Sequence, residues 1–127
     1  HGTVKVWKYS KGKCLKTFKS PFHHLGTLLF STDNSTLYAA SFCGTILVFS
    51  LQTENLLQSI VCDHAISQMA LLNGLLYVAS AQDGIFSIYN PNQTVLNLQK
   101  AFSHKFSRPF MNFEMVDKRT VLLAFSD

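Results

Sequence analysis

The segment Gly2-Thr-Val-Lys-Val-Trp7 decides how this chain is organised, because variants of it return twice. They are Gly44-Thr-Ile-Leu-Val-Phe49 and Gly84-Ile-Phe-Ser-Ile-Tyr89, so the three copies start at positions 2, 44 and 84. Each copy has a glycine, four mainly β-forming residues and an aromatic residue. A further landmark follows the same period, since Leu37-Tyr-Ala-Ala-Ser41 aligns with Tyr77-Val-Ala-Ser-Ala81. The spacing predicts copies of one small β unit.

The residues between these copies also have the character of β-strands. Short runs rich in Val, Ile, Leu, Phe, Tyr and Thr are separated by turn-forming residues at intervals of about ten. No long stretch has the apolar spacing of an amphipathic helix. We expect twelve strands, at 3–7, 13–18, 26–30, 37–41, 45–49, 55–60, 66–71, 75–79, 85–89, 95–99, 110–115 and 120–125. A four-stranded unit repeating about every 40–45 residues is typical of a β-propeller blade. The sequence therefore predicts an all-β chain of four-stranded antiparallel blades.

Several motifs resemble the WD-repeat family of β-propellers. The segment Gly2–Trp7, followed by Gly12-Lys-Cys-Leu-Lys-Thr-Phe18, is similar to the family's Gly-Thr-x-x-x-Trp strand and the outer strand after it. Phe30-Ser-Thr-Asp33 is similar to its Phe-Ser-Pro-Asp hairpin. The copy from Asp83 to Asn90 is a weaker match, and the copy at 43–50 matches mainly through its period. The resemblance covers the whole chain as about three degenerate repeats.

The resemblance also implies a domain organisation. Blade strands in this family run a, b, c and d from the axis to the rim. Residues 1–20 correspond to strands c and d of one blade, 21–61 and 62–103 to two whole blades, and 104–127 to strands a and b of a further blade. Closed propellers have about 4–8 blades. We therefore expect a piece of a longer protein, with the remaining blades of the same propeller packing against it in cis.

In this family a Trp, a Ser or Thr, a His and an Asp of a blade form a buried hydrogen-bonded network. By position, the resemblance implies such roles for Trp7, His23 (or its neighbour His24), Ser41, His64 and Asp83. No repeat has the full set, because Phe49 and Tyr89 stand at Trp positions and Ala81 at a Ser position. Buried polar groups need such partners, since each one left unpaired costs about 1–3 kcal/mol.

Metal and catalytic chemistry have little support in the sequence. His23, His64 and His104 recur at close to the period of the repeat, but no cysteine or carboxylate accompanies each of them at ligand spacing. We interpret them as structural residues of the loops between blades. There is no Gly-x-Ser-x-Gly elbow and no glycine-rich phosphate loop. We expect no enzyme activity, no metal site and no cofactor.

Composition separates this chain from disordered and membrane-spanning sequences. Hydrophobic residues make up 47% of its 127 residues and charged residues 14%, which is too apolar for a disordered tail. The longest apolar runs have five residues, whereas a membrane-spanning helix needs about 20. We interpret the widely spaced Cys14, Cys43 and Cys62 as reduced thiols in the core. Because no signal peptide is present at the start, we expect an intracellular, cytoplasmic protein.

Charge is distributed unevenly along the chain. Residues 1–32 hold six lysines and no acid, whereas residues 33–99 hold four acids and no lysine or arginine. The lysines are Lys5, Lys8, Lys11, Lys13, Lys16 and Lys19. They could bind a phosphate-bearing partner, but their spacing also fits an exposed outer strand whose lysines prevent edge pairing. Because arginine is absent from this segment, we favour the second interpretation and do not expect nucleic acid as the partner.

The function that the resemblance implies is a non-catalytic scaffold for protein–protein interactions. Partners of this family usually bind the loops at one end of the propeller or its rim. The candidate contact residues are Phe22, Phe42, Gln82, Phe106 and Arg108, although phenylalanines also serve packing between blades. One alternative is the sensor or regulatory propeller of a multidomain signalling ATPase of the apoptosome-adaptor type or of a BEACH-type trafficking protein. A second alternative is a phosphate- or nucleic-acid-binding surface at the lysine-rich start.

Overall fold

A computed structural model describes residues 2–21, 24–31, 33–62, 64–72, 74–91, 98–117 and 119–125. The strands are β1 (Thr3–Lys8), β2 (Lys13–Lys19), β3 (Leu25–Phe30), β4 (Thr36–Ser41), β5 (Thr45–Ser50), β6 (Leu56–Val61), β7 (Gln68–Leu72), β8 (Leu75–Ser80), β9 (Ile85–Pro91), β10 (Leu98–Lys105), β11 (Asn112–Asp117) and β12 (Thr120–Ala124). Two short 3-10 helices, η1 (Tyr9–Lys11) and η2 (Ala81–Asp83), interrupt them. The prediction of an all-β chain with twelve strands is confirmed over the part of the chain that the structure describes.

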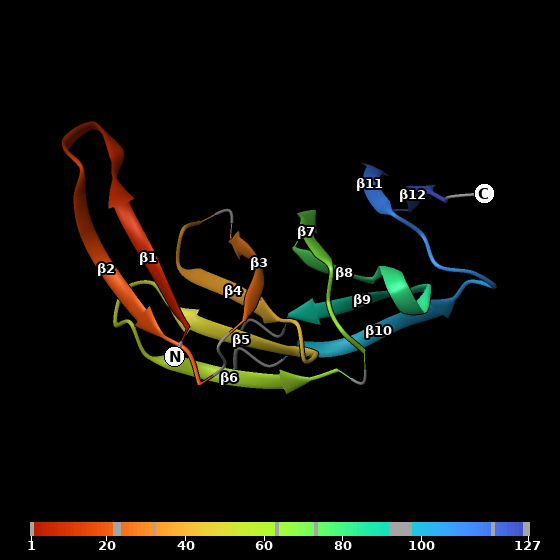
Figure 1. Cartoon of the computed structure of the whole chain (residues 1–127), viewed down its shortest axis with the longest axis horizontal. Helices are drawn as coiled ribbons and strands as arrows, with labels where there is room; N and C mark the ends of the chain where they lie inside the picture. The colour runs from red at the N-terminus through yellow and green to blue at the C-terminus, as the bar shows by residue number, and fades with distance from the viewer. Residues whose placement is uncertain are drawn as a thin grey trace.

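The strands form four separate antiparallel sheets that fan out side by side (Figure 1). Their strand orders are β1-β2, β3-β4-β5-β6, β7-β8-β9-β10 and β11-β12. Each strand pairs with its neighbour in sequence, so the chain meanders through one sheet before it enters the next. Two four-stranded sheets therefore lie between two hairpins, β1–β2 on one side and β11–β12 on the other (Figure 1).

Three apolar clusters hold the sheets against one another. The first joins the β1–β2 hairpin to β4 and β5, and Phe18 and Phe49 stack within it with ring centroids 5.3 Å apart. The second joins β4 and β5 to β8 and β9. The third joins β8 and β9 to the β11–β12 hairpin, where Phe86 and Phe113 meet edge to face at 5.5 Å. The middle strands of the two central sheets are thus covered on both faces, which explains why β4 and β5 are buried almost continuously instead of on alternate residues.

The two central sheets are equivalent, but their register differs by one residue from the repeat predicted above. Tyr38 pairs with Val48, and Tyr77 pairs with Ile88. Val48 and Ile88 are each the fourth residue after the glycine of their copy, so the equivalent of Tyr77 is Tyr38 and not Leu37. The predicted alignment of 37–41 with 77–81 was therefore wrong by one residue, a slip that reverses which sheet face each side chain occupies.

The cause of this shift lies in the turn between the second and third strands. The first central sheet turns through Phe42-Cys43-Gly44, whereas the second has one more residue and forms η2 before Gly84. Ser80, which is buried, therefore stands at the place of Ser41. The predicted replacement of this serine by Ala81 was wrong for the same reason.

The outer strand β10 also differs from its prediction. A strand was expected at 95–99, of which 95–97 lie outside the described residues, and β10 spans Leu98–Lys105. His104 lies in this strand and not in a loop between blades. An outer strand faces solvent on its free edge, so polar residues such as Ser103 and His104 are tolerated there. These residues interrupt the apolar pattern from which a strand is predicted.

The turn after Phe30 is organised by a carboxylate. Asp33 Oδ1 accepts hydrogen bonds from the Ser31 hydroxyl at 2.6 Å, the Ser35 hydroxyl at 2.7 Å and the Ser35 amide at 3.0 Å. These bonds stabilise the ionised form and lower the pKa of Asp33 to about 2, with the Ser31 hydroxyl contributing most. The turn that follows β3 is thereby fixed in the hairpin that joins it to β4.

Truncation of a side chain between two sheets should be costly. Leu47 is fully buried in the first cluster, whereas Leu57 on β6 is 41% exposed. We expect Leu47→Ala to lower the free energy of unfolding by about 2–5 kcal/mol, because it removes apolar contacts and leaves a cavity. Leu57→Ala should change it by no more than about 1 kcal/mol. Urea unfolding followed by circular dichroism measures both, and equal losses would contradict this account of the core.

Candidate functional site

Several loops of the two central sheets gather at one end of the fan. The turns at 42–44 and 81–84, which we call the corner turns, each connect the second strand of a central sheet to the third. The linkers at 62–67 and 106–111 leave the outer strands β6 and β10 at the same end. Antiparallel order places these four loops together, and we call this end of the fan the corner end.

Backbone hydrogen bonds tie each linker to the corner turn beside it. The Cys62 amide donates to the Gly44 carbonyl at 2.7 Å, and the Phe106 amide donates to the Gly84 carbonyl at 2.7 Å. The Phe110 amide adds a bond of 3.1 Å to the Ala81 carbonyl. These bonds fix each linker against the corner turn beside it.

Both corner turns require glycine for two reasons. Gly44 has φ +96° and Gly84 has φ +67°, a region that side chains disfavour. A Cβ on Gly44 would lie 2.7 Å from the carbonyl oxygens of Cys62 and His64, and one on Gly84 would lie 2.7 Å from that of Arg108. The recurring glycine of the repeat thus lets the linker pass directly over the turn.

Two of the predicted contact residues are exposed on the corner turns. Phe42 is 58% exposed, with its ring over Gly26, where an added Cβ would approach ring carbons to 3.0 Å. Gln82 is exposed in η2. A third predicted contact residue, Phe22, lies outside the described residues.

The other two contact residues lie on the linker after β10 and differ in role. Phe106 is half-buried and packs edge to face with Phe110 and Phe125, with centroids 6.1 and 6.0 Å away. Arg108 is exposed, and its guanidinium carbon lies 4.9 Å from the centre of the Phe125 ring, a cation–π geometry. Phe106 thus serves packing, whereas Arg108 is presented to solvent on an aromatic support.

The residues expected in a buried network are arranged differently. His64 Nδ1 and Asp83 Oδ2 lie 3.5 Å apart, but their side chains are 40% and 45% exposed. This pair joins a linker to a corner turn at the surface, so its burial was wrongly expected. Trp7 is 53% exposed, and His23 lies outside the described residues. At the Trp position of the second central sheet, the Tyr89 hydroxyl and the Cys62 thiol share a hydrogen bond of 3.1 Å.

Ser41 has a different partner from the expected histidine network. Its hydroxyl accepts a hydrogen bond from the Thr45 amide at 3.1 Å and lies 2.9 Å from Cys43 Sγ. Hydrogen bonding to Ser41 lowers the pKa of the Cys43 thiol below its ordinary value. Cys43 is exposed, and Cys14 and Cys62 are half-buried, so the prediction that Cys43 is a core thiol was wrong. The exposure of Cys43 was not predicted, because no feature of the sequence distinguishes an exposed cysteine in a turn from a buried one.

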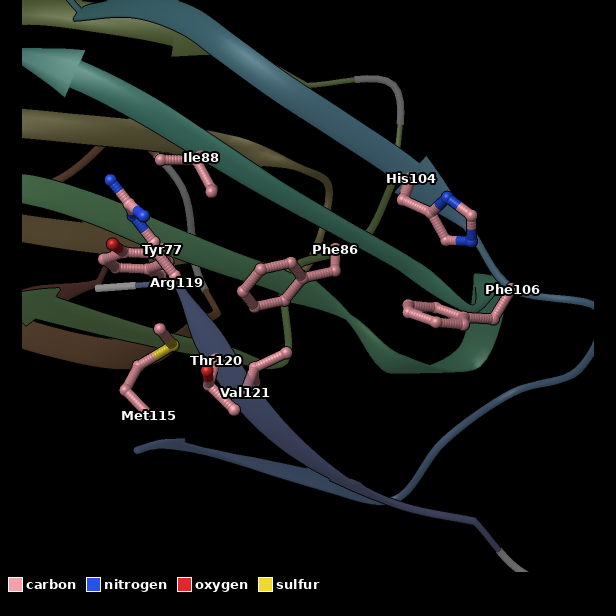
Figure 2. A pocket seen from close by; sticks show the side chains of 9 residues that line it. All are labelled: Tyr77, Phe86, Ile88, His104, Phe106, Met115, Arg119, Thr120 and Val121. Carbon is pink, nitrogen blue, oxygen red and sulfur yellow. The ribbon is translucent and has the colours of Figure 1, made fainter. Parts of the chain in front are cut away.

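An apolar pocket lies between the second central sheet and the β11–β12 hairpin. Its volume is about 490 Å³. Tyr77, Phe86, Ile88, His104 and Phe106 line it from the sheet and its linker, and Met115, Arg119, Thr120 and Val121 line it from the hairpin (Figure 2). The hairpin covers only part of the sheet, so the pocket opens beside it. The sequence alone does not predict this pocket. The pocket exists because the two-stranded β11–β12 sheet covers only part of the four-stranded sheet beside it.

The described residues contain neither a metal-binding cluster nor a membrane-spanning helix. No group of three or more His, Cys, Asp and Glu side chains in this part of the chain could hold a metal ion. Likewise, over the described ranges no helix has the length and apolar character needed to cross a bilayer.

Comparison with known proteins supports the fold. No protein-family model matches this chain, and no curated protein matches it. Among solved structures, the chain is similar to the crystal structure of the β-propeller domain of Cps50 (Swd1) from Myceliophteria thermophila. The TM-score is 0.57 at 17% identity, and the match covers 65% of this chain and 27% of that one. The chain therefore has a β-propeller-type fold, as predicted from the repeat, while membership of the WD-repeat family stays a prediction.

The close approach at Gly44 gives a test with a matched control. Gly12 also has a positive φ, +60°, but an added Cβ there would meet nothing within 4 Å. We expect Gly12→Ala to lower the free energy of unfolding by about 1–2 kcal/mol, the cost of left-handed backbone. Gly44→Ala should lower it further, because its Cβ overlaps two backbone oxygens. Thermal and urea unfolding measure the difference, and equal losses would refute the close approach.

The exposed thiol gives a pH-dependent prediction. A lowered pKa means that more of Cys43 is thiolate near neutral pH, and the thiolate is the reactive form. Iodoacetamide should therefore modify Cys43 before Cys14 and Cys62, as read by peptide mass spectrometry. Ser41→Ala should move the inflection of the rate–pH profile for Cys43 to higher pH. Cys43→Ser identifies the fast phase, and a profile unchanged by Ser41→Ala would show that Ser41 does not set the pKa.

Proposed function

We propose that this chain is a non-catalytic protein-binding scaffold of the WD-repeat type and that its partners bind the corner end. One observation carries the proposal. Phe42, Gln82 and Arg108 are exposed on loops of the corner end. The corner turns are continuous with the central sheets, and the linkers are hydrogen-bonded to the corner turns. Binding residues are commonly found on loops that a rigid framework positions.

The rigidity of these loops favours binding. A flexible loop loses conformational entropy when a partner orders it, and a preformed loop avoids much of that cost. The bonds from Cys62 to Gly44 and from Phe106 to Gly84 hold the corner turns in place before any partner arrives. The contact of 3.5 Å between His64 Nδ1 and Asp83 Oδ2 adds a further link at the same end.

The chemistry of the corner end suits a peptide or protein surface with mixed polarity. Phe42 offers an aromatic face, Gln82 offers amide hydrogen bonds, and Arg108 offers a fixed positive charge. Aromatic residues and arginine are the side chains most enriched among the energetically dominant contacts of protein interfaces. An acidic or carbonyl-rich segment with one apolar anchor would match these three groups.

The blade assignment forms part of this proposal. The sheets β3–β6 and β7–β10 correspond to two whole blades, β1–β2 to strands c and d of one further blade, and β11–β12 to strands a and b of another. Strand pairing and the similarity to a propeller domain support this assignment. Service as the regulatory propeller of a larger signalling or trafficking protein remains compatible with the same binding surface.

The lysine-rich hairpin supports the second alternative, a phosphate-binding surface. Five of its six lysines are exposed, and the sixth, Lys16, is half-buried and donates a hydrogen bond to the Leu51 carbonyl. Phosphate contacts weaken steeply with salt, because bound counterions are released on association. Salt dependence therefore separates this alternative from a corner-end contact.

A peptide-display selection on the immobilised chain tests the proposed surface. We expect selected peptides to lose about tenfold or more in affinity with Phe42→Ala, Gln82→Ala or Arg108→Ala. Gln52→Ala is the matched control for Gln82→Ala, because Gln52 is an exposed glutamine on the β5–β6 turn of the first central sheet, at the end opposite the corner end. Equal losses for Gln52 and Gln82 would contradict the proposal. Polyanionic selected ligands whose affinity falls steeply with salt would instead favour the lysine-rich hairpin.

A further inference from the structure

A second pocket lies between the two central sheets, inside the fan. Its volume is about 270 Å³. Strand β6 and the linker after it line this pocket from the first central sheet, and β8, β9 and β10 line it from the second. We call it the middle pocket. Because each of its walls belongs to a four-stranded sheet, strands added to either side of the fan would lie outside it.

Ser87 stands in the middle pocket where the preceding interface has a leucine. Leu47 is the third residue after the glycine of its copy, and Ser87 is the third residue after the glycine of the next copy. Leu47 is fully buried against the β1–β2 hairpin, in the cluster that contains Phe18 and Phe49. Ser87 faces its own preceding sheet and lines the middle pocket. The hydroxymethyl group of serine fills much less room than the isobutyl group of leucine.

Ile60 is a second difference between the two interfaces. It pairs with Ile46, and Phe18 pairs with Val4 at the same place in the β1–β2 hairpin. Phe18 is 1% exposed and fills the first interface, whereas Ile60 is half-buried and lines the middle pocket. Smaller side chains at both positions explain why the middle pocket lies at this interface.

Ser80 supplies a buried hydroxyl group to the middle pocket. Its counterpart in the first central sheet, Ser41, accepts a hydrogen bond from the Thr45 amide and contacts the Cys43 thiol. The second corner turn is one residue longer, and among the described residues the Ser80 hydroxyl has no hydrogen-bond partner. Ser80 is nevertheless only 5% exposed. Since buried polar groups are normally hydrogen-bonded, this hydroxyl favours a polar ligand.

The other polar groups of the middle pocket are uncharged as well. Ser87 Oγ and Ser103 Oγ lie 3.2 Å apart, and their bond uses only one of the two hydroxyl hydrogens. The Tyr89 hydroxyl and the Cys62 thiol share their bond of 3.1 Å beside them. Among the described residues that line the pocket there is no lysine, arginine, aspartate or glutamate, and His64 is the one basic side chain.

These features select the chemistry of a ligand. An ion would lose its hydration in this pocket without gaining a partner of opposite charge. An alcohol group both donates and accepts hydrogen bonds, as the serine hydroxyls do, so it matches them. Ile60, Val78 and Ile85 offer apolar walls to a carbon skeleton. The volume corresponds to about nine water molecules at roughly 30 Å³ each, which is the room of a small molecule.

We propose that the middle pocket binds a small uncharged polyol, held by the hydroxyl groups of Ser80, Ser87 and Ser103. The carbon chain of the polyol lies against the apolar walls, and its hydroxyls bond to the serines. This site is separate from the protein contact proposed above, because none of the three exposed contact residues of the corner end lines it. A ligand here also connects β6 and its linker to the second central sheet.

A titration followed by nuclear magnetic resonance tests the proposal, on the 127-residue chain labelled with ¹³C in its Ile, Leu and Val methyl groups. The probes are glycerol, xylitol and myo-inositol, three uncharged polyols of increasing size. We expect at least one of them to shift the methyl signals of Ile60, Val78 and Ile85 saturably. The signals of Leu37, which is fully buried at the first interface, should not change.

Pentane-1,5-diol is the control ligand. It has the carbon chain of xylitol without the three inner hydroxyls. It should bind at least about tenfold more weakly than the polyol, because a site that hydrogen-bonds hydroxyl groups rejects a ligand that lacks them.

Substitutions identify the groups that hold the polyol. Ser80→Ala should raise its dissociation constant about three- to tenfold, because one hydrogen bond is lost. This variant should fold, since the Ser80 hydroxyl has no partner among the described residues. Ser59→Ala is the matched control, because Ser59 is exposed on β6 and does not line the pocket. Ser87→Leu introduces the residue type of the first interface and should abolish binding by filling the pocket.

Any of three results would overturn the proposal. If none of the three polyols shifts the pocket methyl signals saturably, the middle pocket holds water only. An affinity for pentane-1,5-diol equal to that for the polyol would show that hydroxyl groups are not recognised. Binding that survives Ser87→Leu unchanged would place the ligand elsewhere on the chain.

Discussion

The structure depends on the need of its central sheets to bury both faces. Val48 faces the following sheet, and Phe49, the next residue, faces the preceding hairpin, and both are almost fully buried. A sheet of this kind cannot remain exposed on either side, because each face carries apolar area worth about 25 cal/mol per Å² when it is buried. The places of the loops and the exposure of the two sides of the fan follow from the way the chain meets this requirement.

The corner end results from the same constraint. Sheets stacked face to face leave only their ends for loops, and antiparallel order brings the corner turns and linkers to one end. Gly44 and Gly84 allow the linkers to cross the turns closely, so that the exposed Phe42, Gln82 and Arg108 project from a fixed backbone. A surface of exposed side chains on fixed loops thus forms as a consequence of sheet packing.

The sides of the fan show what happens where the requirement is met only in part. The hairpins β1–β2 and β11–β12 each cover part of a central sheet and leave apolar groups exposed. The pocket beside Phe86 and the exposed Trp7 are two of these consequences. Inside the fan, Phe49 and Tyr89 each pack against the apolar surface of the preceding sheet.

Sequence alone determined the all-β fold, the twelve strands and the meander through equivalent sheets, because glycine and aromatic residues at a fixed period are local features that pattern reading detects. It also identified Gln82 and Arg108 as exposed and paired His64 with Asp83 by position. The tertiary structure alone decided the register of Tyr77, which a single inserted turn residue controls, and the exposure of Cys43 and Trp7. It also decided that Phe106 packs while Phe42 is exposed. Whether a side chain is exposed depends on which element packs against it. That element comes from another part of the chain and is placed by sheet packing, so the residues next to it in sequence do not determine its exposure.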